Sequence, residues 1–169
     1  MAFISISITK NHPLILGKGG FGRQLADWLS AEGWGEAEFL DDSAPGCVGG
    51  LRDYADPKLL KPGRPAFVAL RVELLQKLAA AGYDTPVFIS DMAAVSPSAV
   101  LEPGCVILPQ AYVGADAHLG VGCIINGGAI VDHDAVLGRG VHVAPGGIVK
   151  AGAEVEALTK VDSGEIIKK

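Results

Sequence analysis

A histidine flanked by two carboxylates has the residue types and spacing for acid–base chemistry. Asp132, His133 and Asp134 are consecutive in the 169-residue chain. Neighbouring carboxylates orient an imidazole ring and raise its basicity, which is what a general base needs. The alternative is a solvated surface histidine, the commoner state of this residue in an arbitrary protein. The sequence therefore nominates His133 as a base and leaves that alternative open.

Two more histidines lie close enough in the sequence to be considered with His133. His118 precedes it by 15 residues and His142 follows it by 9. Zinc sites on a repeating coil, as in the γ-type carbonic anhydrases, pair two histidines closely on one coil, and these separations do not match. We therefore expect no metal, and we expect a structural or solvated role for His118.

A glycine-rich turn near the N-terminus is the second group that could bind a ligand. Gly17, Gly19, Gly20 and Gly22 lie in the sequence GKGGFG, directly after the short apolar segment 14–16. Unpaired amides at such a turn, together with the dipole of a following helix, favour a phosphate. A tight structural turn between a strand and a helix is the alternative.

An aspartate follows the glycine turn at a distance typical of dinucleotide sites. Asp41 stands 19 residues beyond Gly22, where such sites place a ribose-binding acid. A nicotinamide cofactor is nevertheless disfavoured. The first part of the chain is only about 90 residues long and shows no second mononucleotide-binding half.

The element that must position His133 begins at Ala94, where the chain repeats every six residues without an insertion. The second residue of all thirteen hexads is aliphatic: Val95, Leu101, Ile107, Val113, Leu119, Ile125, Val131, Leu137, Val143, Val149, Val155, Val161 and Ile167. A long exact period indicates a repeat architecture. Three sides of six residues make a coil of 18 residues, and each coil should add one strand to each of three parallel sheets, about 4.8 Å above the last.

The sixth hexad position carries small residues in most of the repeat. Two of them, Cys105 and Cys123, lie one coil apart, and we expect compact core side chains there and not nucleophiles. The position becomes Thr159 and then Glu165 near the end. This change predicts that regular coiling stops near Ala153.

The first hexad position places apolar side chains on the outside of the coil. Tyr112, Ile130, Ile148 and Ile166 form one such column. An outward apolar ladder usually needs cover. We therefore predict that it lies at a subunit interface or under the N-terminal part of the chain.

Residues 1–90 have the pattern of an α/β domain. We expect strands over residues 14–16, 38–40, 66–70 and 87–89, a helix from the glycine turn to about residue 33, and a helix over residues 72–81. Strands that alternate with helices predict a parallel sheet with covering helices, which is a Rossmann-like arrangement. The chain is thus divided into residues 1–90 and 91–169, and the first unit is small enough that it should dock on the second.

Composition excludes several classes of function. The net charge is -5 and no basic run occurs, which argues against a nucleic-acid partner. No apolar run reaches the roughly 20 residues needed to insert into a membrane, and the first residues lack the pattern of a signal peptide. Three cysteines without metal-ligand spacing suit the cytoplasm.

Taken in order, GKGGFG, FLDD and hexads that carry INGGAIVDHD and VHVAPGG resemble one bacterial family. It is the sugar O- and N-acyltransferases of the sialic-acid O-acetyltransferase type, whose relatives include N-acetyltransferases acting on UDP-4-amino-sugars. The resemblance covers nearly the whole chain. It implies a left-handed β-helix, a handedness that the period alone does not give, behind a Rossmann-like domain that binds the nucleotide sugar.

The resemblance also implies an activity. A homotrimer of this family binds acetyl-CoA along the β-helix between subunits and acetylates an amine or hydroxyl of a sugar or nucleotide sugar for surface glycans. By motif match, His133 is the general base and Asp134 its orienting carboxylate. Asn126 and His142 are implied to contact the substrate. His142, Ala151 and Gly152 are implied to contact acetyl-CoA, with backbone amides near Ala151 and Gly152 on the thioester oxygen. The residues implied to lie near the nucleotide are Gly17, Gly19, Gly20 and Asp41.

The chain departs from the family pattern at three places. Phe21 stands where the family usually has histidine, and Asp91-Met92 stands where it has His-Pro. After Ala153 only a short segment remains, where the family continues for further coils. From this last difference we expect a CoA groove that is shallow, rebuilt or lost. The alternative function is therefore a non-catalytic nucleotide-sugar-binding or scaffold trimer.

Overall fold

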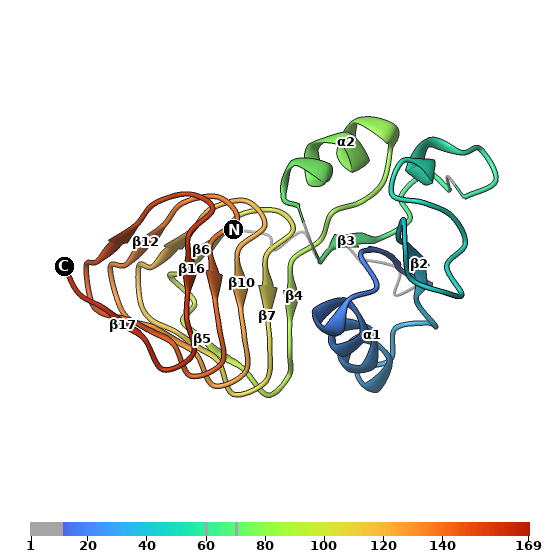
Figure 1. Cartoon of the computed structure of the whole chain (residues 1–169). Helices are drawn as coiled ribbons and strands as arrows, with labels where there is room; N and C mark the ends of the chain where they lie inside the picture. The colour runs from blue at the N-terminus through green and yellow to red at the C-terminus, as the bar shows by residue number, and fades with distance from the viewer. Residues whose placement is uncertain (1–11, 60, 70) are drawn as a thin grey trace.

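The computed structural model describes residues 12–59, 61–69 and 71–169, and it shows a small α/β part followed by a long parallel β-helix (Figure 1). The elements of the α/β part are β1 (Leu14–Leu16), α1 (Gly20–Ala31), β2 (Glu38–Leu40), the 3-10 turn η1 (Asp53–Ala55), β3 (Ala66–Val68) and α2 (Glu73–Ala81). The strands of the β-helix are β4 (Phe88–Ile89), β5 (Ala94–Val95), β6 (Val100–Leu101), β7 (Val106–Ile107), β8 (Tyr112–Val113), β9 (His118–Leu119), β10 (Ile124–Ile125), β11 (Ile130–Val131), β12 (Val136–Leu137), β13 (His142–Val143), β14 (Ile148–Val149), β15 (Glu154–Val155), β16 (Lys160–Val161) and β17 (Ile166–Ile167).

The α/β part is a three-stranded parallel sheet with a helix on each face. Its strand order is β2-β1-β3, so β1 is central. Leu14 and Leu16 pack in one core with Leu75 of α2, while Ile15 packs in another with Leu25 of α1. Because α1 and α2 cover the two faces of the sheet, all three residues of β1 are apolar, as is usual for buried parallel strands.

The predicted α/β class is confirmed in a reduced form. The first three strands and both helices form close to their expected positions, and α2 ends at Gly82 with φ 97°. Within the described residues this sheet has three strands, which is fewer than a complete Rossmann-like sheet. The strand expected at 87–89 forms as β4 but pairs with β7 of the β-helix. In the described part of the chain, neither helix is long and apolar enough to cross a membrane.

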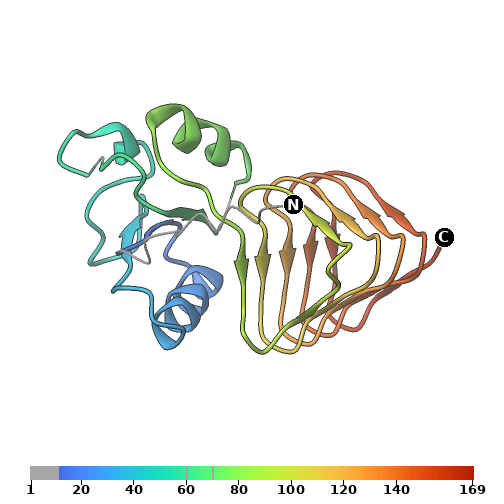
Figure 2. The same ribbon diagram turned by 180° about the vertical axis from the view of Figure 1, so that it is seen from behind.

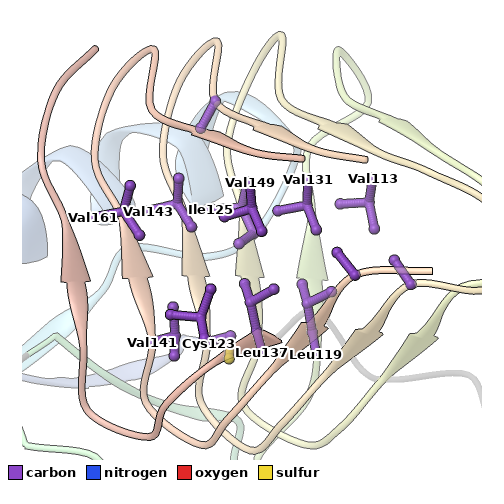
Figure 3. Packing of buried hydrophobic residues seen from close by; sticks show 14 of the residues in the cluster. Val113, Leu119, Cys123, Ile125, Val131, Leu137, Val141, Val143, Val149 and Val161 are labelled. Carbon is purple, nitrogen blue, oxygen red and sulfur yellow. The ribbon is translucent and has the colours of Figure 1, made fainter. Parts of the chain in front are cut away.

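The hexads build a three-sided prism, as predicted. The first sheet holds β4, β7, β10, β13 and β16, the second β5, β8, β11, β14 and β17, and the third β6, β9, β12 and β15. Strands pair in parallel with an offset of one coil, as in Ile130 with Ile148. Figure 2 shows the coils stacked away from the α/β part, with the C-terminus at the far end. The second hexad residues fill the interior with the small sixth residues (Figure 3).

The prediction that regular coiling stops near Ala153 is wrong. β15, β16 and β17 continue the three sheets as far as Ile167, and Val161 is fully buried. The interior needs only the aliphatic second position to persist, and it does. The polar Glu165 is exposed, so it does not have to fit a closed core.

The α/β part docks on the first sheet, as expected of a unit too small to be stable alone. Val106 and Leu108 of the β-helix share a core with α1 residues Leu25 and Leu29. Val72, the N-cap of α2, and Leu75 pack against the corner between the third and first sheets: a Cβ atom at Gly122 would lie 2.5 Å and 2.6 Å from their side chains. Gly104 and Gly140 occupy the same corner on the neighbouring coils, and the absence of side chains there lets the two units approach closely.

The outward apolar ladder belongs to the second sheet and not to the docked one. Tyr112, Ile130 and Ile166 are 44%, 37% and 47% exposed. The α/β part therefore does not cover this ladder, which overturns one of the two predicted alternatives. A subunit interface stays a prediction.

Candidate active site

His133 lies in the turn that joins β11 to β12, on the prism edge between the second and third sheets. Its Nδ1 pairs with Asp134 Oδ2 at 2.7 Å, and its backbone amide donates to Asp132 Oδ1 at 2.8 Å. The histidine side chain is 59% exposed. With the proton on Nδ1, the lone pair of Nε2 faces solvent. This is the geometry of an oriented general base open to a substrate.

The same contacts control the protonation of His133. The hydrogen bond to Asp134 is the largest cause that raises the pKa of His133 above 6.5, and the charges of Asp132 and Asp134 add to it. A raised pKa makes the imidazole a stronger base but keeps more of it protonated near neutral pH. A reaction that uses neutral His133 should therefore speed up as pH rises through a pKa above 6.5.

Replacing Asp134 with asparagine tests this electrostatic role without disturbing the turn. Asp134 has φ 58°, a conformation that asparagine also adopts readily. We expect the rising limb of the pH–rate profile to move to lower pH, because the pKa of His133 falls, and the plateau rate to fall because the ring is less well oriented. Steady-state rates from pH 5 to 9 measure both. An unchanged limb would mean that His133 is not the titrating base.

The coils above and below His133 explain its placement. A Cβ atom at Gly114, one coil earlier, would lie 2.5 Å from the amide nitrogen of His133. On the following coil, the Gly152 amide donates to the carbonyl of His133 at 3.0 Å. Gly152 is therefore engaged inside the coil. Within the described part of the chain the Ala151 amide has no acceptor, so it is the one available to a ligand oxygen. Sequence reasoning missed Gly114, whose only signal is its offset of one coil.

Asn126 and His142 form a second group, separate from His133. Asn126 is buried, its Oδ1 accepts from the Gly127 amide at 2.8 Å, and its Nδ2 lies 3.4 Å from His142 Nε2. Burial, then the nearby charge of Lys160, lowers the pKa of His142, so it is neutral at neutral pH. The ring of Phe21, from the start of α1, lies 5.9 Å from the His142 ring. This group therefore joins the β-helix to the glycine turn.

The two groups occupy different parts of the prism. Asn126 lies on the edge between the first and second sheets, and His142 lies in the first sheet. The edge that carries His133 is the one opposite the first sheet, on which the α/β part docks. A whole side of the prism, on the order of 15 Å, separates the two edges. Within one chain these residues do not come together, and the resemblance implies a site between neighbouring subunits.

The glycine turn is held by its own contacts. Gly17 has φ 104°, and a Cβ atom at Gly22 would lie 1.9 Å from the Gly17 carbonyl oxygen, so both positions require glycine. Asp41 accepts from the Lys18 amide at 2.8 Å. It also accepts from the amides of Ser43 and Ala44. These backbone hydrogen bonds lower the pKa of Asp41 to about 2. The carboxylate therefore binds the turn to the loop that follows β2.

The remaining candidates have structural contacts. His118 Nε2 pairs with Glu102 at 2.9 Å on the third sheet. Cys105 and Cys123 are fully buried, and Cys123 Sγ donates to the Gly138 carbonyl at 3.1 Å. Across the described residues, histidine, cysteine and acidic side chains form no cluster that could hold a metal ion.

Comparisons with known proteins place this geometry in a family. No family model and no curated protein matches the chain. Among solved structures, the acetyltransferase domain of PglB from Neisseria gonorrhoeae FA1090 in complex with acetyl coenzyme A is 32% identical, covering 93% of this chain and 87% of that one, with a TM-score of 0.73. A second structure of that domain has a TM-score of 0.79 at 28% identity, over 94% of this chain and 91% of that one.

A relative with a nucleotide sugar in its structure is also similar. PerB from Caulobacter crescentus, in complex with CoA and GDP-perosamine, is 27% identical over 94% of this chain and 89% of that one, with a TM-score of 0.74. Hexads, a docked α/β part and the His133–Asp134 pair thus occur together in a chain that matches these enzymes over nearly its whole length. The chain belongs to the hexapeptide-repeat, left-handed β-helix sugar acyltransferases.

Proposed function

We propose that this protein transfers the acetyl group of acetyl-CoA to an amine or hydroxyl of a nucleotide sugar, in the synthesis of a surface glycan. The observation that carries the proposal is the exposed His133–Asp134 pair, joined at 2.7 Å on the edge of a β-helix of this family. The solved relatives support the substrates, because one binds acetyl coenzyme A and another binds CoA with GDP-perosamine. Acetyl-CoA is a co-substrate here, and the reaction needs no metal.

The residues divide the reaction between them. His133 Nε2 removes a proton as the acceptor nitrogen or oxygen attacks the thioester carbonyl carbon. The Ala151 amide, which has no acceptor in the described part of the chain, donates to the oxygen that becomes negative. The carbon–sulfur bond then breaks, and the proton on His133 passes to the departing thiolate to give CoA. No acyl-enzyme is formed.

One chain cannot complete this site, which supports a homotrimer. His133 lies on the prism edge opposite the sheet that carries the glycine turn, Asn126 and His142. In the proposed trimer of left-handed β-helices, His133 of one subunit faces the α/β part of the next. Acetyl-CoA lies between them, near Ala151, Gly152 and His142. The ladder of exposed Tyr112, Ile130 and Ile166 with half-buried Ile148 supplies an apolar surface for that contact.

The acceptor's nucleotide lies at the α/β part. Gly17, Gly19, Gly20 and Asp41 stand at the carboxyl edge of its parallel sheet, the edge where open α/β sheets bind nucleotides. The three-stranded sheet thus takes the role of a Rossmann-like domain. Because acetyl-CoA is a cytoplasmic metabolite, the enzyme acts in the cytoplasm.

Mixing two inactive variants tests the shared site. His133→Ala and His142→Ala proteins should each have little activity. After unfolding and refolding together, they should regain about a quarter of the wild-type rate, because a site with both wild-type histidines forms at some interfaces of a mixed oligomer. Acetyl transfer before and after mixing is the measurement, with each variant refolded alone as the control. No recovery would place both residues in one chain's site.

The activity itself is tested with acetyl-CoA and a panel of UDP-, GDP- and CMP-sugars that carry a free amine, with thiol release as the signal. We expect turnover with at least one nucleotide amino sugar and none without acetyl-CoA. The scaffold alternative assumes a degenerate CoA site at the end of a shortened β-helix, whereas regular coils continue past Ala153 to Ile167. If acetyl-CoA fails to bind at millimolar concentration, the scaffold function is correct.

A further inference from the structure

The buried side chain of Asn126 fits its neighbours in only one orientation. Its Oδ1 accepts from the Gly127 amide at 2.8 Å, and its Nδ2 lies 3.4 Å from His142 Nε2. Turning the side-chain amide by 180° would bring Nδ2 against the Gly127 N–H, so that two donors would face each other. Asn126 therefore presents a hydrogen-bond donor to His142.

This contact determines which nitrogen of His142 carries the proton. A donor opposite Nε2 needs a lone pair on that atom, so the single proton of the neutral ring lies on Nδ1. A doubly protonated ring would set its Nε2–H against the NH₂ group of Asn126. In the part of the chain that the structure describes, Nδ1 of His142 has no partner. Its N–H is therefore available to an oxygen of a bound ligand.

The β-helix around His142 also favours the neutral ring. On the preceding and following coils of the first sheet, the paired residues are Ile124 and Lys160. Lys160 Nζ is itself paired with Asp162 Oδ1 at 2.9 Å. Burial and the positive charge of Lys160 both lower the pKa of His142. Among the described residues no carboxylate pairs with the ring, so no such pair offsets the cost of charging it.

Phe21 covers the same ring from the α/β part. It is the second residue of α1, and its ring centre lies 5.9 Å from that of His142, with the two planes at 50°. The nearby cation of α1, Arg23, is directed elsewhere, because its guanidinium donates to the Lys18 carbonyl at 3.0 Å. The side chain of Phe21 has no hydrogen-bonding atom. It therefore excludes water and raises the cost of charging His142 without competing for Nδ1.

His133 has the opposite surroundings, because it is exposed and its Nδ1 pairs with the Asp134 carboxylate at 2.7 Å. Titratable groups in opposite environments take different roles in one reaction. We propose that Asn126 and Phe21 are positioning residues that hold His142 as a neutral hydrogen-bond donor, with its proton on Nδ1, and not as a second base. In the transfer, this N–H donates to an oxygen of a bound substrate. The role in transfer rests on the proposed function, whereas the place of the proton does not.

Nitrogen-15 NMR of the histidine rings, on the full chain without ligands, tests the place of the proton. The chain has four histidines, and the signals that disappear in His142→Ala are those of His142. We expect a protonated Nδ1 and an unprotonated Nε2 from pH 7 to 9. A proton on Nε2, or a ring that is charged at pH 7, would overturn the proposal.

Asn126→Asp places an acceptor where Asn126 places a donor, with almost no change in shape. The carboxylate should draw a proton onto Nε2 of His142, and kcat/KM for acetyl transfer should fall about ten-fold because the Nδ1 donor is lost or the ring becomes charged. Gln110→Glu is the matched control. It adds the same charge at an exposed turn of the same prism edge, and it should leave the proton and kcat/KM unchanged.

Two substitutions of Phe21 separate its covering role from its bulk. Phe21→Ala should admit water to the ring, so that His142 becomes protonated at a higher pH than in the wild type. Phe21→Leu keeps an apolar cover and should restore the wild-type titration. If His142 in Phe21→Ala titrates as in the wild type, Phe21 is not a positioning residue.

The outcomes distinguish this proposal from the enzymatic one. If the proton lies on Nδ1 and moves in Asn126→Asp, but no sugar is acetylated, the positioning stands and the proposed function fails. If acetyl transfer occurs and Asn126→Asp keeps the wild-type spectrum and kcat/KM, the function stands and the positioning fails. A moved proton with an unchanged kcat/KM would overturn the role of His142 as a donor. Thermal melts of each variant confirm that it is folded.

Discussion

Replacing His133 with alanine should lower kcat for acetyl transfer by about 10² to 10⁴, the usual contribution of a positioned general base. The side chain is 59% exposed, and among the described residues its ring forms a hydrogen bond with Asp134 alone, so its removal leaves no cavity in the core. The KM for acetyl-CoA should change little, because the loss falls on the transition state. Initial rates of thiol release at saturating substrates measure the effect.

His118→Ala is the matched control for this prediction. His118 is also an exposed histidine of the β-helix with a carboxylate partner, Glu102 at 2.9 Å, but it lies on the outer face of the third sheet and not at the His133 edge. Its removal should leave kcat within about two-fold of the wild type, as is usual for a surface change away from a site. A His133→Ala enzyme that keeps full activity would show that the acceptor is deprotonated by another group.

Gly22→Ala should destabilise the α/β part more than other single-methyl changes near the site. The new Cβ would lie 1.9 Å from the Gly17 carbonyl oxygen, which is backbone and cannot swing aside. Such overpacking costs about 3 kcal/mol, against about 1 kcal/mol gained from helix propensity. We therefore expect a net loss of about 2 kcal/mol in the free energy of unfolding. The glycine turn and Asp41 would be displaced with it.

Gly20→Ala makes the same substitution in the same helix with opposite consequences. No atom lies within 4 Å of a Cβ at Gly20, and its φ is not positive. This variant should match or slightly exceed the wild type in stability. Urea unfolding followed by tryptophan fluorescence measures both, because the two tryptophans of the chain, Trp28 and Trp34, lie in the α/β part. Equal midpoints for the two variants would show that the turn can relax.

The repeat could be predicted from the sequence because its information is local. Each aliphatic second residue, from Val113 to Val161, points inward through the alternation of a single strand, and the exact period stacks the strands without further choice. The end of the coil differs from the sequence prediction, because polar residues at the sixth position, such as Glu165, do not interrupt it. A polar side chain would interrupt the coil only if another element buried it, and Glu165 is exposed to solvent.

The sheet to which β4 belongs could not be decided from its own residues. Phe88 and Ile89 are a short apolar run that would suit either the α/β sheet or the β-helix. The pairing with β7 follows the offset of the prism, because Ile89 lies opposite Ile107, 18 residues later, as in the other strand pairs. The period of the following coils therefore decides the sheet, and the two residues of β4 do not.

The sequence alone determined the prism, the place of His133 on an outward corner beside Asp134, and the α/β unit before it. These follow from a six-residue period and from neighbours in the chain, which backbone geometry converts directly into position. Only the tertiary structure showed that Asn126 and His142 lie away from the His133 edge, and that Phe21 lies against the His142 ring. Those facts depend on how the coil closes and how the units pack. Such contacts are set by complementary shape across long separations, and no local pattern records them.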